Sequence, residues 1–206
     1  MNRKLIIFDF DGVLINSEKN MQLTWDKTIK NFKEYNINFR EYKNNIGLPF
    51  NKILENLSIK KKDFKQITNY YKKNSLYYQN KIKLFKGVKP LIKKLKKKYK
   101  IALFTSKDNY RTKFLIKKFD LKFDFIVAGN DVKKGKPHPE GLKKIMKKLN
   151  FKRNSIFYIG DTTYDYYCSK KVKIKYIHVN WGIETIKKYK DIIFVKNIKQ
   201  LTKLLL

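Results

Sequence analysis

Residues 5–14 read LIIFDFDGVL: four consecutive apolar residues, then two aspartates two positions apart, and then a glycine. A short apolar run without polar alternation is typical of a strand that is buried on both faces of a sheet. Five further runs of this kind follow: Ile101–Phe104, Phe125–Ala128, Ile156–Ile159, Ile174–Val179 and Ile192–Val195. Stretches that predict helices lie between most of them: Val88–Lys98, Asn109–Phe119, Glu140–Leu149 and Thr163–Lys171. The alternation predicts an α/β fold with a doubly wound parallel sheet.

One interval breaks the alternation, because roughly 90 residues separate the first apolar run from the second, far more than one crossover needs. Three stretches within it have helical periodicity, and none resembles a strand: Met21–Phe32, Phe50–Leu57 and Phe64–Tyr78. We therefore expect residues 1–15 and 82–206 to form the α/β core domain. Residues 16–81 are expected to form an inserted α-helical cap domain.

The composition is strongly basic, with 50 Lys+Arg against 17 Asp+Glu and a formal net charge of +33. Such a charge could indicate a nucleic-acid-binding protein. However, the abundant residue types have A/T-rich codons, and alanine and glycine are scarce, which favours an AT-rich genome as the source of the lysines. Arginine, which nucleic-acid readers prefer, is also scarce. We therefore expect no nucleic-acid partner. Hydrophobic residues make up 42% of the chain, enough for a packed core, which excludes general disorder.

Cysteine content and hydrophobic run lengths predict a cytoplasmic protein. Cys168 is the single cysteine, so no intramolecular disulfide can form, as suits a reducing compartment. No apolar stretch approaches the length of a membrane span, and acidic residues interrupt the N-terminal run too early for a signal peptide. We expect no membrane association, and the sequence leaves the oligomeric state open.

Polar residues follow the predicted strands at their carboxyl ends, where open parallel sheets bind ligands. These residues are Asp9, Asp11, Thr105, Ser106, Lys136, Asp161 and Asp165. On an extended backbone, Asp9 and Asp11 point to the same side and repel each other unless a cation or a proton intervenes. Oxygen ligands of this kind favour Mg²⁺. A turn in which an aspartate caps the backbone and Gly12 supplies the bend is the alternative interpretation.

The other strand ends also have two interpretations each. Asp161 and Asp165 lie four residues apart at the start of a predicted helix, so they share a face, but Asp161 could also be a helix N-cap. Thr105 and Ser106 precede a helix whose expected cap is Asp108, an environment that suits an anion. Alone, Thr105 would be an ordinary β-branched strand residue.

Taken together and in this order, four segments resemble the haloacid dehalogenase superfamily of phosphotransferases. The segments are Phe8–Leu14, Thr105–Lys107, Gly135–Glu140 and Ile159–Asp165. The position of the helical insertion resembles the subgroup of phosphoglycolate phosphatase and β-phosphoglucomutase, which carries its cap there. The resemblance implies a Rossmann-like core that extends over almost the whole predicted sheet domain.

The resemblance also implies roles for these residues. Asp9 would be the nucleophile and Asp11 the general acid and base, with Thr105, Ser106 and Lys136 binding phosphoryl oxygens. Mg²⁺ would be held by the Asp9 side chain, the Asp11 backbone carbonyl and Asp161. Asp165 would orient Lys136 or a metal-bound water, and Gly12 and Gly160 would support the two acidic loops. The insertion offers a candidate substrate loop at Asn45, Gly47 and Leu48.

The predicted function is a Mg²⁺-dependent phosphatase that hydrolyses a small phosphorylated metabolite, a phosphomonoester, through an aspartyl-phosphate. Dehalogenating members lack the second aspartate of the first segment, so Asp11 argues against dehalogenation. Two alternatives stay open: a phosphomutase that resembles β-phosphoglucomutase, and a basic nucleic-acid-binding protein on the same scaffold.

Overall fold

The computed structural model of the chain describes residues 4–184, 186 and 189–206. Its main sheet has six strands: β1 (Leu5–Phe8), β4 (Lys100–Phe104), β5 (Phe125–Val127), β6 (Ile156–Gly160), β7 (Lys175–Val179) and β8 (Ile192–Val195). All neighbouring pairs are parallel, in the order β5-β4-β1-β6-β7-β8. The six predicted strands are therefore confirmed, with ends that differ by one residue at most.

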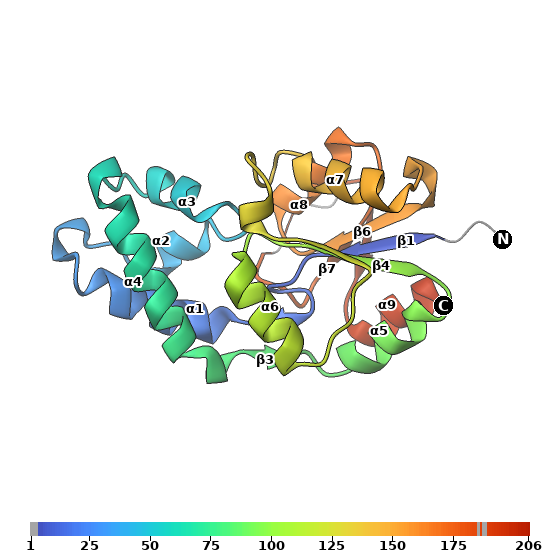
Figure 1. Cartoon of the computed structure of the whole chain (residues 1–206), viewed down its shortest axis with the longest axis horizontal. Helices are drawn as coiled ribbons and strands as arrows, with labels where there is room; N and C mark the ends of the chain where they lie inside the picture. Colours follow the sequence, from blue (N-terminus) through green and yellow to red (C-terminus); the bar gives the residue numbers. More distant parts are fainter. Residues whose placement is uncertain (1–3, 185, 187–188) are drawn as a thin grey trace.

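Helices cover both faces of this sheet (Figure 1). One layer comprises α5 (Val88–Lys96), α6 (Asn109–Lys118) and α9 (Ile198–Leu205), and the other comprises α7 (Glu140–Leu149) and α8 (Thr163–Lys171). Strand side chains alternate between the two apolar cores: Ile6 and Phe8 join the first layer, and Leu5 and Ile7 join the second. This arrangement confirms the doubly wound α/β fold and four predicted helices, whereas α9 was not predicted.

The long interval after β1 folds into four helices, which lie beside the sheet at the left of Figure 1. They are α1 (Glu18–Ile29), α2 (Phe39–Lys43), α3 (Phe50–Asn56) and α4 (Phe64–Tyr77). They share an apolar core around the fully buried Trp25, and only the five-residue α2 was not predicted. The boundaries of the core and cap domains stay a prediction.

The chain crosses twice between the sheet and these helices, and the two crossing segments are hydrogen-bonded to each other. They form the short strands β2 (Ile15–Asn16) and β3 (Lys83–Leu84), which are antiparallel and were not predicted. Five 3-10 turns complete the described structure: Lys33–Tyr35, Lys61–Asp63, Gln79–Lys81, Gly129–Asp131 and Arg153–Ser155. No helix in the described ranges is long and apolar enough to cross a membrane.

The strand order fixes where a ligand can bind. After β1 the chain builds the sheet outward through β4 and β5, and then returns to the other side of β1 through β6, β7 and β8. The direction of winding therefore reverses at β1. The carboxyl ends of β1, β4 and β6 form the crevice at this switch point, and the helical insertion leaves the core just after β1.

Candidate active site

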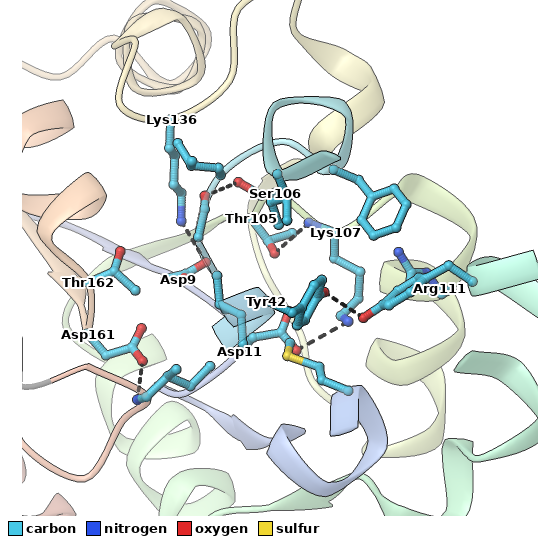
Figure 2. A pocket seen from close by; sticks show the side chains of 18 residues that line it. Asp9, Asp11, Tyr42, Thr105, Ser106, Lys107, Arg111, Lys136, Asp161 and Thr162 are labelled. Atoms are coloured by element: carbon cyan, nitrogen blue, oxygen red, sulfur yellow. Dashed lines mark hydrogen bonds and ion pairs between the residues drawn. The ribbon is translucent and has the colours of Figure 1, made fainter. Parts of the chain in front are cut away.

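A cavity of about 60 Å³ opens at the carboxyl ends of the three central strands, between the sheet and the helical insertion (Figure 2). Its charged and hydroxyl-bearing lining includes Asp9, Asp11, Tyr42, Tyr71, Thr105, Ser106, Lys107, Arg111, Lys136, Asp161 and Thr162. Six of the predicted site residues thus meet at one place, although 152 positions separate Asp9 from Asp161 in the chain. The apolar remainder of the lining comes mainly from the insertion.

Lys136 is the most enclosed cation of the cavity, because its side chain is only 1% exposed. Its ammonium lies 2.7 Å from Asp9 Oδ1 and 2.8 Å from Asp165 Oδ1. Burial lowers the pKa of Lys136, but the two carboxylates outweigh it and raise that pKa above its usual value. Lys136 is therefore a permanent cation that sits between the two acids.

Asp165 lies behind the cavity wall and anchors this lysine. Tyr158 Oη donates to Asp165 Oδ1 at 2.5 Å, and the Thr162 hydroxyl donates to Asp165 Oδ2 at 2.7 Å. Burial raises the pKa of Asp165, but Lys136 and these hydrogen bonds bring the pKa below its usual value. Asp165 is thus held as an anion against Lys136. That it orients Lys136 or a metal-bound water stays a prediction.

The two acids that face the cavity, Asp9 and Asp161, both have raised pKa values. Burial raises the pKa of Asp9 to about 7, with Lys136 opposing the effect and Asp165 adding to it. Burial also raises the pKa of Asp161 well above its usual value, helped by the nearby charges of Asp9 and Asp165. Two buried carboxylates in this condition favour either protonation or a bound cation.

The donor set fits a hard cation. Carboxylate oxygens of Asp9, Asp161 and Asp165 lie within 4.8 Å of one another. Asp161 Oδ2 accepts a hydrogen bond of 2.7 Å from the Ile183 amide, whereas the buried Asp161 Oδ1 has no hydrogen-bond partner among the described residues. Both oxygens of Asp165 already have protein partners, Lys136 and Tyr158 at Oδ1 and Thr162 at Oδ2. Asp9 and Asp161 are therefore the side chains that could hold Mg²⁺.

Glycines make room for this acidic centre. Gly12 has φ +75°, and a Cβ atom there would lie 1.9 Å from Asp161 Oδ2. A Cβ atom on Gly160 would lie 2.5 Å from the Asp165 Cβ.

The structure also shows that Thr162, and not Asp161, is the N-cap of α8, so the capping alternative for Asp161 is wrong. Asp108 caps α6, as predicted.

Asp11 is directed away from the acidic cluster. Its Oδ1 accepts a 2.5 Å hydrogen bond from the Ser17 hydroxyl and lies 3.2 Å from the Lys107 ammonium. The Asp11 side chain is 13% exposed, more than that of Asp9 at 7%. A carboxyl group in this position, which is both hydrogen-bonded and reachable from the cavity, can exchange a proton with a ligand or with water.

Thr105 and Ser106 end β4 at the cavity, but their surroundings differ. Thr105 is buried, and its Oγ1 accepts a hydrogen bond of 3.1 Å from the Lys107 amide. The Ser106 hydroxyl instead donates to the Gly47 carbonyl at 2.7 Å, so it links the core to the helical insertion. Of the predicted substrate loop, Gly47 and Leu48 line the cavity, whereas Asn45 is not among its lining residues.

Sequence reasoning gave no role to five polar residues of the lining: Lys107, Arg111, Thr162, Tyr42 and Tyr71. Lys107 directly follows Thr105 and Ser106, and this adjacency was the signal that could have singled it out among the lysines. Arg111 follows four residues later, in the first turn of α6. The two tyrosines come from α2 and α4, and only the packing of the insertion against the core brings them to the site.

Fold and site together define a class of protein. The family model of haloacid dehalogenase-like hydrolases matches residues 6–179, which is most of the chain. The chain therefore belongs to the haloacid dehalogenase-like hydrolase family, and the predicted family, fold class and enzyme class are confirmed.

Curated relatives extend over nearly the full chain. The pyrophosphatase PpaX of Halalkalibacterium halodurans is 27% identical over 186 residues, which are 89% of this chain and 86% of that protein. A protein of Caldanaerobacter subterraneus that is assigned the same activity is 27% identical over 97% of this chain and 93% of its own length.

Solved structures share the fold. A haloacid dehalogenase-like protein from Bacteroides fragilis superposes with a TM-score of 0.87 at 23% identity, covering 98% of this chain and 100% of that chain. A Lactobacillus plantarum protein assigned as a phosphoglycolate phosphatase gives a TM-score of 0.86 at 16% identity, with coverage of 99% and 100%. At these identities the likeness concerns the fold.

Proposed function

We propose that the enzyme is a Mg²⁺-dependent phosphatase that acts on a small phosphorylated metabolite through an aspartyl-phosphate on Asp9. The observation that carries the proposal is the position of Asp9, which is buried at the floor of the cavity with Lys136 at 2.7 Å and an acidic partner in Asp161. A carboxylate that is fixed by a buried ammonium group and placed beside a cation site can act as a nucleophile toward phosphorus.

In the first step an oxygen of Asp9 attacks the phosphorus, and the bond from phosphorus to the leaving oxygen breaks. Asp11 donates its proton to that oxygen, so that a free alcohol and an acyl phosphate on Asp9 result. Lys136 and the Thr105 hydroxyl bind the other phosphoryl oxygens, and Asp165 keeps Lys136 in place. Mg²⁺ held by Asp9, Asp161 and the Asp11 backbone carbonyl would draw negative charge from the phosphoryl group.

In the second step a water molecule attacks the same phosphorus while Asp11, now a carboxylate, takes one proton from it. The bond between phosphorus and the Asp9 oxygen breaks, which releases inorganic phosphate and restores the Asp9 carboxylate. Asp11 ends the cycle protonated, as it began, so that the protons balance. The limited exposure of its side chain lets one group serve in both directions.

Hydrolysis of p-nitrophenyl phosphate with and without Mg²⁺ tests the proposal. We expect turnover that requires the metal and falls by roughly 1000-fold or more in Asp9→Asn, because an amide cannot form the acyl phosphate. Asp26→Asn, which changes an acid of α1 that does not line the cavity, is the matched control. Turnover that survives in Asp9→Asn would overturn the assignment of the nucleophile.

The pyrophosphatase names of the curated relatives support a second substrate. A phosphoanhydride would undergo the same two steps, with a phosphate as the leaving group in place of an alcohol. The phosphomutase alternative requires that a second hydroxyl of the substrate, and not water, attacks the phospho-enzyme. Product analysis separates the two outcomes, since a mutase releases an isomeric phosphate and no inorganic phosphate.

A further inference from the structure

Two cations of the cavity, one buried and one partly buried, have no part in the steps above. Lys107 comes from the segment after β4, and Arg111 comes from the first turn of α6. Their side chains are only 4% and 14% exposed. In Figure 2 they lie on the opposite side of the cavity from Lys136 and Asp161, with Asp11 between the two groups. They therefore flank the space beyond the reacting phosphorus.

We propose that Lys107 and Arg111 form a subsite for a second anionic group, a carboxylate or a phosphate, which is carried by the leaving group of the substrate. This inference rests on the proposed phosphatase function and names the substrate class. It predicts that small substrates with a negatively charged leaving group are hydrolysed faster than alkyl phosphates with a neutral one. p-Nitrophenyl phosphate stays a usable assay substrate, because its aryl leaving group departs more easily than an alkyl alcohol.

The position of Asp11 carries the first step of the argument. The general acid marks where the leaving oxygen must lie, because it hands its proton to that atom. The Lys107 ammonium lies 3.2 Å from Asp11 Oδ1, so it is within a few ångströms of the leaving group.

Arg111 extends this positive region toward the helical insertion. Its Nε lies 2.6 Å from Asp108 Oδ2, and its Nη1 donates to the Ser75 hydroxyl of α4 at 3.0 Å. These two bonds use two of the five donors of the guanidinium group and fix its plane at the cavity wall. The fixed fork matches a carboxylate or a phosphate in the plane of the guanidinium group.

The cavity limits the size of the leaving group. It encloses only about 60 Å³, and the buried hydroxyls of Tyr42 and Tyr71, which lie 2.8 Å apart, close the side formed by the insertion. A leaving group in this space is in contact with Lys107, Arg111 or the tyrosine hydroxyls. A charged group of a few atoms would be stabilised there, whereas an uncharged one would leave Lys107 and Arg111 without a new partner.

Three probes that differ in the leaving group test the subsite: phosphoglycolate (a carboxylate), pyrophosphate (a phosphate) and ethyl phosphate (neutral). We expect the wild-type kcat/KM for at least one anionic probe to exceed that for ethyl phosphate by about 100-fold. The preferred probe tells whether the second anion is a carboxylate or a phosphate. Equal kcat/KM values for all three would overturn the subsite.

Substitutions test whether Lys107 and Arg111 cause the preference for anionic leaving groups. In Arg111→Gln and Lys107→Gln, the ratio of kcat/KM for the preferred anionic probe to that for ethyl phosphate is expected to fall by about tenfold or more. Arg111→Lys should restore part of the ratio, because it keeps the charge. Lys113→Gln, on the exposed face of α6, is the matched control and should keep the wild-type ratio. Equal losses on all three probes would indicate a merely structural role and overturn the inference.

The design separates the two proposals. If none of the three probes is hydrolysed in the presence of Mg²⁺, the phosphatase function itself fails. Calorimetric binding of the same probes to Asp9→Asn then tests the subsite without turnover. Tighter binding of an anionic probe than of ethyl phosphate, and its loss on adding Arg111→Gln, would support the subsite, whereas equal binding of all three would contradict it.

Discussion

Lys136 shows how one side chain joins stability to catalysis. Its ammonium separates two buried carboxylates that lie 2.7 and 2.8 Å away. Lys136→Met would leave Asp9 and Asp165 with no cation between them, so we expect the free energy of unfolding to fall by about 3–5 kcal/mol. Phosphatase turnover should fall as well, because the nucleophile loses the group that positions it.

Guanidinium unfolding and the aryl phosphate assay measure both effects. Lys134→Met, an exposed lysine two positions earlier, is the control and should change stability by about 0.5 kcal/mol or less. A Lys136→Met protein as stable and as active as the control would contradict the ion-pair arrangement.

The burial of His178 predicts a second property: the free energy of unfolding decreases in acid. It is fully buried in β7, and Tyr176 Oη lies 3.3 Å from its Nδ1. Burial lowers the pKa of His178 from 6.5 to about 4. Because the unfolded chain binds the proton more readily, this stabilising contribution is complete above pH 6.5 and is lost as the pH falls toward 4.

We therefore expect the difference in unfolding free energy between pH 7 and pH 5 to shrink by about 2 kcal/mol in His178→Phe relative to the wild type. Guanidinium unfolding at the two pH values measures it. His138→Gln, at the other histidine of the chain, is the matched control. An equal pH effect in the wild type and His178→Phe would show that this histidine is not the acid-sensitive group.

At the residue scale, the sequence predicted the acids better than the bases. Asp9, Asp11 and Asp161 directly follow or nearly follow buried strands, so their position at one edge of the sheet follows from the topology alone. Lys107 was given no role because lysine is abundant everywhere in the chain, and Arg111 was given none because it lies inside a predicted helix. Their burial depends on the packing of α4 and α2 over the site, which no local pattern encodes.

At the element scale, strands buried on both faces were predicted to within one residue. Their apolar runs have no competing interpretation once helical stretches alternate with them. The strands β2 and β3 span only two residues each, and α2 spans only five, so none of the three has a detectable periodicity in the sequence. The two strands form because tertiary contacts bring their backbones together, whereas α2 begins at a capping box between Asn38 and Glu41.

The loop at Gly47 is one of the elements that join the insertion to the core. Its carbonyl accepts the Ser106 hydrogen bond, its φ is +107°, and an added Cβ would lie 3.0 Å from Thr162 Oγ1 and from Tyr164 Cδ2. Gly47→Val would strain the backbone and push the loop away from the core. We expect KM to rise by roughly tenfold or more, with a smaller change in kcat.

Steady-state kinetics on the best substrate test this prediction. Asn44→Ala, an exposed position three residues earlier, serves as the control. A Gly47→Val enzyme with the KM of the control would show that the contact between loop and core does not organise the substrate side of the cavity.

At the scale of the whole molecule, the net charge of +33 is distributed over the surface. Lys107 and Lys136 are the only lysines that are buried in the described part of the chain, and both line the cavity. The surface lysines therefore remain available for weak electrostatic contacts with any polyanion.

We expect binding to duplex DNA to be independent of sequence and to weaken by about 100-fold or more between 50 and 200 mM salt. Fluorescence anisotropy with two unrelated duplexes measures it. Sequence-specific affinity that persists at 200 mM salt would instead revive the nucleic-acid-binding alternative.

The central claim is that Asp9 carries the phosphoryl group. The most direct measurement is to stop the reaction with acid during turnover, reduce the protein with borohydride and determine the mass of the peptide that contains residues 5–14. An aspartyl-phosphate is reduced to homoserine, so we predict homoserine at position 9 and its absence from Asp9→Asn. Turnover in the presence of Mg²⁺ with an unmodified Asp9 throughout would contradict the account.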